Sequence, residues 1–125
     1  MAATSDRSDV ANFTIDVRCV DGVSVLEVAG ELDLSSAPAL CARLEQALGD
    51  SPAGVVVDLS ALEFCDSTGL RALAGAAEEA RIRLARLVIV APSRPAAARA
   101  FELSGAAEFL PLVDDLSTAL EFVSS

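Results

Sequence analysis

Apolar residues occupy the odd positions from residue 11 to 17, and polar residues fill the positions between them. A period of two indicates a β-strand with one buried face. The turn signal Asp21-Gly22 and a second strand-like run at residues 23–29 follow, so the pattern predicts an antiparallel hairpin. Residues 1–9 are small and polar, which predicts a flexible N-terminal tail before the hairpin.

A helical period comes next, because leucine recurs at every fourth position from residue 40 to 48. This spacing predicts an amphipathic helix that Ser35 or Ser36 caps and that ends at Gly49. An almost continuous apolar run at residues 54–59 then predicts a strand that is covered on both faces, as in parallel sheets.

A second amphipathic helix is predicted after that strand, with Asp66 or Ser67 as its N-cap. Its apolar positions are expected to face the core and its charged positions to face water. The expected buried stripe is Leu70, Leu73, Ala77 and Leu84, and the expected wet side is Arg71, Glu78, Glu79 and Arg81.

The last third of the chain repeats the alternation of strand and helix. Residues 87–90 predict a buried strand, and the loop at residues 92–95 leads into a helix that Gly105 closes. Residues 109–112 predict a short final strand, and Asp114 or Asp115 is expected to cap a final helix.

The order ββαβαβαβα places the chain in the α/β class. Strands that alternate with helices pair in parallel through right-handed crossovers, while the opening hairpin makes the sheet mixed. We therefore expect one domain over residues 10–125, with a mixed, mainly parallel sheet of about five strands and four helices.

Two absences from the composition exclude several enzyme classes. The chain contains no histidine, and its nine basic residues are all arginine, so it contains no lysine. A Ser-His-Asp triad, a histidine-ligated metal and a P-loop all require one of these residues. We therefore expect no enzymatic activity and no cofactor. A net charge of −10 argues further against nucleic acid or an anionic membrane as a partner.

The cysteines and the lengths of the apolar segments indicate the cellular compartment. Cys19, Cys41 and Cys65 are odd in number and widely spaced, which favours reduced thiols over a disulfide framework or a zinc site. The first residues lack the apolar stretch of a signal peptide, and no run of about 18 apolar residues could span a membrane. The expected location is the cytoplasm.

The most informative stretch is residues 64–70, Phe-Cys-Asp-Ser-Thr-Gly-Leu, where a strand leads into a helix. A helix start offers unpaired N–H groups and partial positive charge, so it suits a phosphate. Three interpretations are open: Ser67 receives a phosphate, attacks a substrate, or merely caps the helix with Asp66. Attack is disfavoured because the chain has no histidine or lysine as base. Asp58, expected at the tip of the central strand, could suggest a phosphoaspartate receiver. Without a lysine it is better interpreted as a loop-fixing acceptor.

Two segments in this element order, Gly30-Glu31-Leu32-Asp33 and residues 58–70, resemble the STAS domain. The second reads Asp-Leu-Ser-Ala-Leu-Glu-Phe-Cys-Asp-Ser-Thr-Gly-Leu, and it is fairly specific because all its parts occur in the family's order. More narrowly, the chain is similar to free-standing bacterial anti-sigma factor antagonists. The likeness covers about residues 10–123, so residues 10–125 are expected to form a STAS domain.

The resemblance implies a partner-switching mechanism in transcription regulation. The unphosphorylated protein binds an anti-sigma factor that is also a serine kinase, and this frees the sigma factor. The kinase phosphorylates a serine that matches Ser67, which weakens the complex, and a serine phosphatase reverses the change. The neighbouring Thr68 is the second candidate for the acceptor.

The resemblance also implies a partner-binding surface around Ser67. Gly69 would leave the face of the loop open, whereas Leu70 could either contact the partner or begin the buried stripe. Asp33 could be a partner contact or only a cap or turn residue, and Ser93 and Arg94 could be contacts or solvated loop residues. The expected surface comprises Asp33, Asp66, Ser67, Thr68, Gly69, Leu70, Arg71, Ser93 and Arg94.

The alternative to a free-standing antagonist is a scaffold or sensor STAS subunit of a larger stress-signalling assembly. That alternative predicts large oligomers, whereas the antagonist is expected to be a monomer or a weak dimer. The absence of any additional sensory segment and the strong negative charge favour the antagonist.

Overall fold

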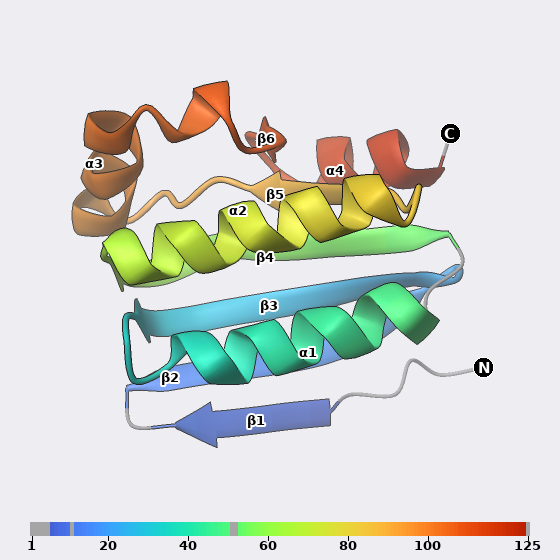
Figure 1. Ribbon diagram of the computed structural model, residues 1–125, viewed down its shortest axis with the longest axis horizontal. Coiled ribbons are helices and arrows are strands. Elements are labelled where there is room, and N and C mark those ends of the chain that lie inside the picture. Colours follow the sequence, from blue (N-terminus) through green and yellow to red (C-terminus); the bar gives the residue numbers. More distant parts are fainter. Residues whose placement is uncertain (1–5, 11, 51–52, 125) are drawn as a thin grey trace.

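Helices lie on both faces of one twisted sheet in a computed structural model of the chain (Figure 1). The structure describes residues 6–10, 12–50 and 53–124. The strands are β1 (Asp6–Val10), β2 (Phe13–Val20), β3 (Val23–Leu32), β4 (Gly54–Cys65), β5 (Leu87–Val90) and β6 (Leu112–Val113). The helices are α1 (Ala37–Asp50), α2 (Ser67–Ile82), α3 (Pro95–Ser104) and α4 (Leu116–Ser124), with a short 3-10 helix at Ala106–Glu108.

The sheet order follows the chain, β1-β2-β3-β4-β5-β6. Strands β2 and β3 pair antiparallel, while β3 to β6 pair in parallel, which confirms the mixed, mainly parallel sheet. The hairpin turn is Asp21-Gly22, and both residues have positive φ values of 50° and 84°. Two such residues are what a type I′ hairpin turn requires, so the predicted turn signal is confirmed.

The N-terminal segment differs from the expected tail. Residues Asp6–Val10 form strand β1, which pairs antiparallel with β2 from Asp6↔Val17 to Val10↔Phe13. The prediction of a tail through residue 9 is therefore wrong for residues 6–9, and the sheet has six strands, not about five. Backbone pairing at a sheet edge needs no apolar side chains, so composition alone gave no strand signal. Residues 1–5, 11 and 125 lie outside the described residues.

Two apolar cores flank the sheet. One lies beneath α1, α2 and α3, where Leu40, Leu44 and Leu73 are completely or almost completely buried. The other lies beneath α4 on the opposite face. The central strand β4 supplies both, because Val55 and Val57 belong to the first core and Val56 to the second. The prediction of a strand covered on both faces is confirmed.

Two local expectations are wrong. Leu84 lies beyond the end of α2, has a φ of 57° and is 93% exposed, so it does not continue the buried stripe. The last strand begins at Leu112 instead of at residue 109. The chain before it is held in a tight turn, in which the N–H groups of Phe109 and Leu110 both donate to the carbonyl of Ala106. Those local bonds occupy backbone groups that a strand would have used.

Candidate functional site

The two segments singled out from the sequence meet at the ends of β3 and β4. Leu32 is the register partner of Cys65, and the N–H of Asp66 donates to the carbonyl of Leu32 at 3.2 Å. The carboxyl ends of parallel strands are where open α/β sheets usually place their sites. In Figure 1 this end, at the left, also carries the starts of α1, α2 and α3.

Asp66 is the N-cap of α2. Its backbone is extended, and its carboxylate Oδ1 accepts the N–H of Gly69 at 3.0 Å. Its carbonyl accepts the N–H of Leu70 at 3.0 Å. Ser67 is therefore the first helical residue, and its side chain is not needed to cap the helix. Its side chain is exposed, and no hydrogen bond within the described part of the chain occupies its hydroxyl.

Asp33 anchors a separate turn that leads from β3 into α1. Its carboxylate accepts the Ser35 hydroxyl at 2.7 Å and the Ser35 N–H at 3.0 Å. The Ser35 hydroxyl bond is the main reason why the pKa of the Asp33 carboxyl lies below its ordinary value. The hydroxyl of Ser36 is fully buried and donates to the carbonyl of Glu31 at 2.8 Å. Asp33 is thus a turn residue, held one position beyond the strand end that meets Asp66.

Gly69 and Leu70 shape the site from beneath. A Cβ on Gly69 would lie 2.7 Å from the Leu32 Cγ, 2.8 Å from the Cys65 Sγ and 2.9 Å from the Leu32 carbonyl oxygen. Gly69 is buried, so the expectation that it leaves the loop face open is wrong: it allows α2 to approach the strand ends. Leu70 is only 9% exposed and begins the buried stripe of α2.

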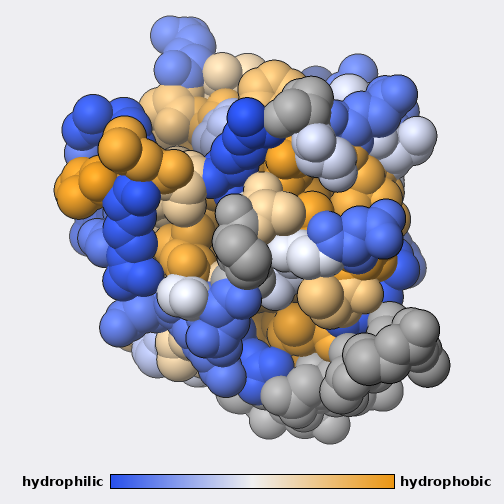
Figure 2. Space-filling view, turned by 90° about the vertical axis from the view of Figure 1, so that its right-hand side faces the viewer, coloured by the Kyte–Doolittle hydropathy of each residue, from blue (hydrophilic) through white to orange (hydrophobic). Residues whose placement is uncertain are grey.

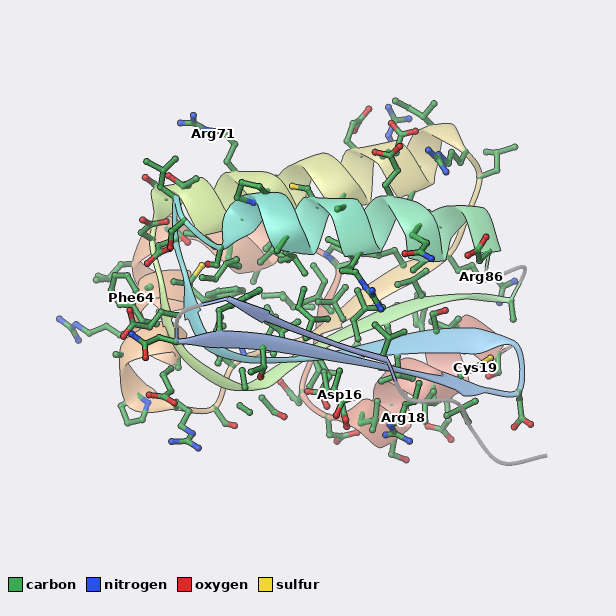
Figure 3. All side chains as sticks on the ribbon, turned by 90° about the horizontal axis from the view of Figure 1, so that it is seen from below. Asp16, Arg18, Cys19, Phe64, Arg71 and Arg86 are labelled. Atoms are coloured by element: carbon green, nitrogen blue, oxygen red, sulfur yellow. The ribbon has the colours of Figure 1, made fainter. Side chains whose placement is uncertain are left out.

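The other predicted site residues lie around this surface. Thr68 is half-buried, and Arg71, Ser93 and Arg94 are exposed. The Ser93 hydroxyl donates to the carbonyl of Ser60 at 3.0 Å, which ties the loop before α3 to β4. Figure 3 shows the side chain of Arg71 projecting from α2 away from the sheet, at the same end of the molecule as Phe64.

Asp58 has the predicted chemistry at an unexpected place. Its carboxylate accepts the N–H of Ser60 at 3.0 Å, which confirms it as a local hydrogen-bond acceptor. It lies within β4 and not at a strand tip, because β4 continues to Cys65. The pairing of β3 with β4 is irregular just beyond this point, between Glu27 and Ala29.

A groove between α1 and α2 was not foreseen from the sequence. Its volume is about 730 Å³, and it begins beside Thr68 and Leu34, which is 75% exposed. The groove forms only where the two helices pack side by side, so no pattern along the sequence predicts it. Apart from these two, its lining residues are Ala37, Pro38, Cys41, Leu44, Glu45, Leu48, Arg71, Ala72, Gly75, Ala76, Glu79 and Arg83.

The opposite end of the molecule has a different surface. Figure 2 views that end and shows apolar patches interleaved with hydrophilic side chains. Of the exposed apolar residues, Ile82 is the last residue of α2 and Leu84 lies two residues beyond it. The hydroxyl pair Ser67-Thr68 lies at the other end of the same helix.

Cys65 is expected to remain unlabelled by a thiol reagent while the protein is folded. Burial, reinforced by the charge of Asp66, raises the pKa of its thiol from 9.0 to about 12, and the thiolate is the reactive form. Cys19 and Cys41 are exposed and should react. Mass spectrometry after iodoacetamide treatment at pH 8 should show two modifications in buffer and three in urea. Rapid modification of Cys65 in buffer would contradict the packing beneath α2.

Neither a metal site nor a membrane-spanning helix is found in the part of the chain that the structure describes. Those residues contain no group of three or more His, Cys, Asp or Glu side chains able to hold a metal ion. None of the helices formed by them has the length and apolar character needed to cross a membrane.

The fold and the site together define a small α/β domain. It exposes a serine in the first turn of a helix, where the ends of two parallel strands meet. Residues 14–119 match the family described as the STAS domain. The chain belongs to the STAS domain family, which confirms the resemblance stated from the sequence.

Individual relatives agree with this membership. A crystal structure of an anti-sigma factor antagonist from Mycobacterium paratuberculosis is 37% identical, with a TM-score of 0.80, over 94% of this chain and 99% of that one. The anti-sigma-F factor antagonist RsfB of Mycobacterium tuberculosis is 41% identical over 68 residues, which is 54% of this chain and 56% of RsfB. The unphosphorylated anti-sigma factor antagonist SpoIIAA shares the fold, with 22% identity and a TM-score of 0.69 over 87% of this chain and 95% of that one.

Proposed function

We propose that this protein is an anti-sigma factor antagonist that acts by binding and not by catalysis. Its unphosphorylated form binds an anti-sigma factor that is also a serine kinase, and the sigma factor is thereby released. The observation that carries the proposal is the state of Ser67. Its side chain is exposed, and its hydroxyl is not needed to cap α2 because Asp66 caps that helix. The names of the relatives at 37% and 41% identity support the same class.

Phosphorylation of Ser67 is the proposed switch, and the chemistry belongs to the partner. The Ser67 Oγ attacks the γ-phosphorus of ATP bound to the kinase, and its proton passes to a base of the kinase. A bond forms between Oγ and phosphorus, the bond from phosphorus to the β–γ bridging oxygen breaks, and ADP leaves. A serine phosphatase would restore the hydroxyl by hydrolysis. Thr68 remains the second candidate acceptor.

The phosphate should change the surface without unfolding the domain. A phosphate at the start of α2 lies where the helix dipole favours negative charge, and the N–H groups of Ser67 and Thr68 are available to it. It would add about −1.5 to −2 charges next to the carboxylates of Asp66 and Asp33. After phosphorylation, this surface would repel acidic groups of a partner that fits it while Ser67 is neutral. The close contact with such a partner would also leave no room for the phosphate.

The proposed partner surface is centred on Ser67, Thr68 and Arg71. The turn at Asp33 and the loop with Ser93 and Arg94 border it, whereas Gly69 and Leu70 support it from beneath. Apolar contact area is available nearby, because Leu34 is 75% exposed and Phe64 is 43% exposed. Protein interfaces typically combine apolar contact area of this kind with polar contacts.

A binding series with the cognate kinase would test the proposal. Ser67→Ala should bind as tightly as the parent protein and accept no phosphate there, whereas Ser67→Asp should bind at least about tenfold more weakly, which corresponds to about 1.4 kcal/mol. Calorimetry measures the affinities, and intact mass with peptide mapping locates the phosphate. Equal affinities of the Ala and Asp variants would refute the switch.

A matched control is available at the start of another helix. Ser117 is exposed in the first turn of α4, on the opposite face of the sheet. Ser117→Asp adds the same charge in a similar helical position and should leave partner affinity unchanged. Equal weakening by Ser117→Asp and Ser67→Asp would mean that net charge, and not the Ser67 surface, controls binding.

The cytoplasm is the proposed location, and a monomer or weak dimer is the proposed state. Light scattering at micromolar concentration should give a mass close to 12.8 kDa or twice that value. Large assemblies would instead favour the scaffold or sensor subunit of a stress-signalling complex.

A further inference from the structure

We propose that Arg71 is the internal counter-ion of the phosphorylated serine, pairing with the phosphate on Ser67 across one turn of α2. This inference rests on the proposed function only in that Ser67 is taken as the residue that carries the phosphate. It assigns to Arg71 a task in the phosphorylated state, in addition to its place on the partner surface of the unphosphorylated state.

The other arginines of α2 and its C-cap reveal a pattern that Arg71 breaks. Arg81 pairs with Glu78, three residues earlier, and the Arg83 Nε lies 2.7 Å from the Glu79 Oε2, four residues earlier. Residues three and four apart share one side of a helix, which is why such pairs form. The corresponding positions before Arg71 hold Thr68 and Ser67. Arg71 therefore has hydroxyl groups at the positions where Arg81 and Arg83 have carboxylate partners.

The following turn of α2 also offers Arg71 no carboxylate to pair with. The positions three and four after Arg71 are Ala74 and Gly75, which are uncharged. Arg71 is exposed, and no ion pair occupies its guanidinium within the described residues. This is notable in a chain with 19 acidic residues and only nine basic ones.

The nearby carboxylates are differently placed or already engaged. Asp66 accepts the N–H of Gly69, and Asp33 accepts bonds from Ser35. Glu45 of α1 lines the same groove as Arg71, and so does Glu79, which Arg83 already holds. Glu45 is thus the one remaining carboxylate of the groove that could compete with a phosphate for Arg71.

Side-chain direction favours the phosphate on Ser67. Side chains of an α-helix tilt toward its N-terminus, so a long arginine covers the turn that precedes its own Cα. For Arg71 that turn contains Ser67 and Thr68. Guanidinium and phosphate form strong charge-assisted hydrogen bonds, often with two N–H groups on two oxygens. Phosphorylation would then add a negative group and also withdraw Arg71 from the partner surface.

The test needs neither kinase nor partner, because phosphoserine can be incorporated at position 67 during translation. The phosphate of the full-length protein is titrated by ³¹P NMR, and its second ionisation midpoint is compared with that of the Arg71→Gln variant. Loss of a paired cation disfavours the dianion, so Arg71→Gln should raise the midpoint, with a two- to threefold fall in the ionisation constant, as for about 0.5 kcal/mol. The difference should shrink in about 1 M salt, where the screening length is about 3 Å.

Two further variants make the outcome specific. Arg81→Gln removes the same charge from the same helix but at a residue paired with Glu78, so its midpoint should equal that of the parent. Arg71→Lys keeps the charge and should retain most of the parent's value. Equal midpoints for Arg71→Gln and Arg81→Gln would overturn the inference. A kinase that fails to modify Ser67 would instead count against the proposed function and leave the ³¹P result intact.

Discussion

Gly69→Ala is expected to destabilise the folded protein by about 1–3 kcal/mol, because the added methyl group has no space. Its Cβ would lie 2.7 Å from the Leu32 Cγ and 2.9 Å from the Leu32 carbonyl oxygen. The carbonyl cannot retreat freely, since it accepts the N–H of Asp66. Urea denaturation, followed by circular dichroism, measures the change in the free energy of unfolding.

Gly75→Ala is the matched control for this substitution. Gly75 lies in the middle of the same helix, and a Cβ there would meet nothing within 4 Å. Alanine is the better helix former, so Gly75→Ala should stabilise the protein by about 0.5–1 kcal/mol. Opposite signs at the two glycines would establish that close packing, and not helix propensity, dictates glycine at position 69. Equal effects would contradict the close approach of α2 to the strand ends.

Leu32→Ala is the second large expected effect, a loss of about 2–5 kcal/mol in the free energy of unfolding. Leu32 is fully buried at the end of β3, beneath the first turn of α2. Truncation leaves a cavity between the strand end and the helix, and the rigid backbone on both sides limits its collapse. The same urea titration measures it, with unchanged m-value as the sign that only stability has changed.

The double variant Leu32→Ala/Gly69→Ala should be less destabilised than the sum of the single variants. The alanine methyl at position 69 can occupy part of the space that Leu32 vacates, although the Cys65 Sγ remains 2.8 Å from the Cβ position. Residues in direct contact commonly show coupling energies of at least about 0.5 kcal/mol. Strict additivity would contradict the contact between α2 and β3.

These effects matter for function because the site is built on the packed joint of two strands. The cap at Asp66, the strand end at Leu32 and the buried Gly69 fix the first turn of α2, and Ser67 is presented from that turn. Under the proposed function, a partner that recognises Ser67 would meet a preformed surface, and a phosphate placed there would alter charge and shape without loosening the core. We expect variants of this joint to weaken partner binding even when Ser67 itself is unchanged.

Much of the fold was predictable because hydrophobic periodicity is a local property of the chain. The alternation in β2, the leucine spacing in α1 and the apolar run of β4 each specify an element without reference to distant residues. The same holds for the hydroxyl pair at the start of α2. Strong local signals placed Ser67 at a helix start and left the choice of cap between two neighbours.

Tertiary structure decided the features that depend on distant segments. Strand β1 exists because the edge of β2 offers backbone partners, and β3 and β4 extend to Leu32 and Cys65 because they pair with one another. Gly69 is buried only because those strand ends lie beneath it. The sequence by itself thus determined the elements and the candidate serine. Only long-range packing placed Asp66 against the end of β3 and formed the groove beside Arg71, because these outcomes depend on which groups meet in space.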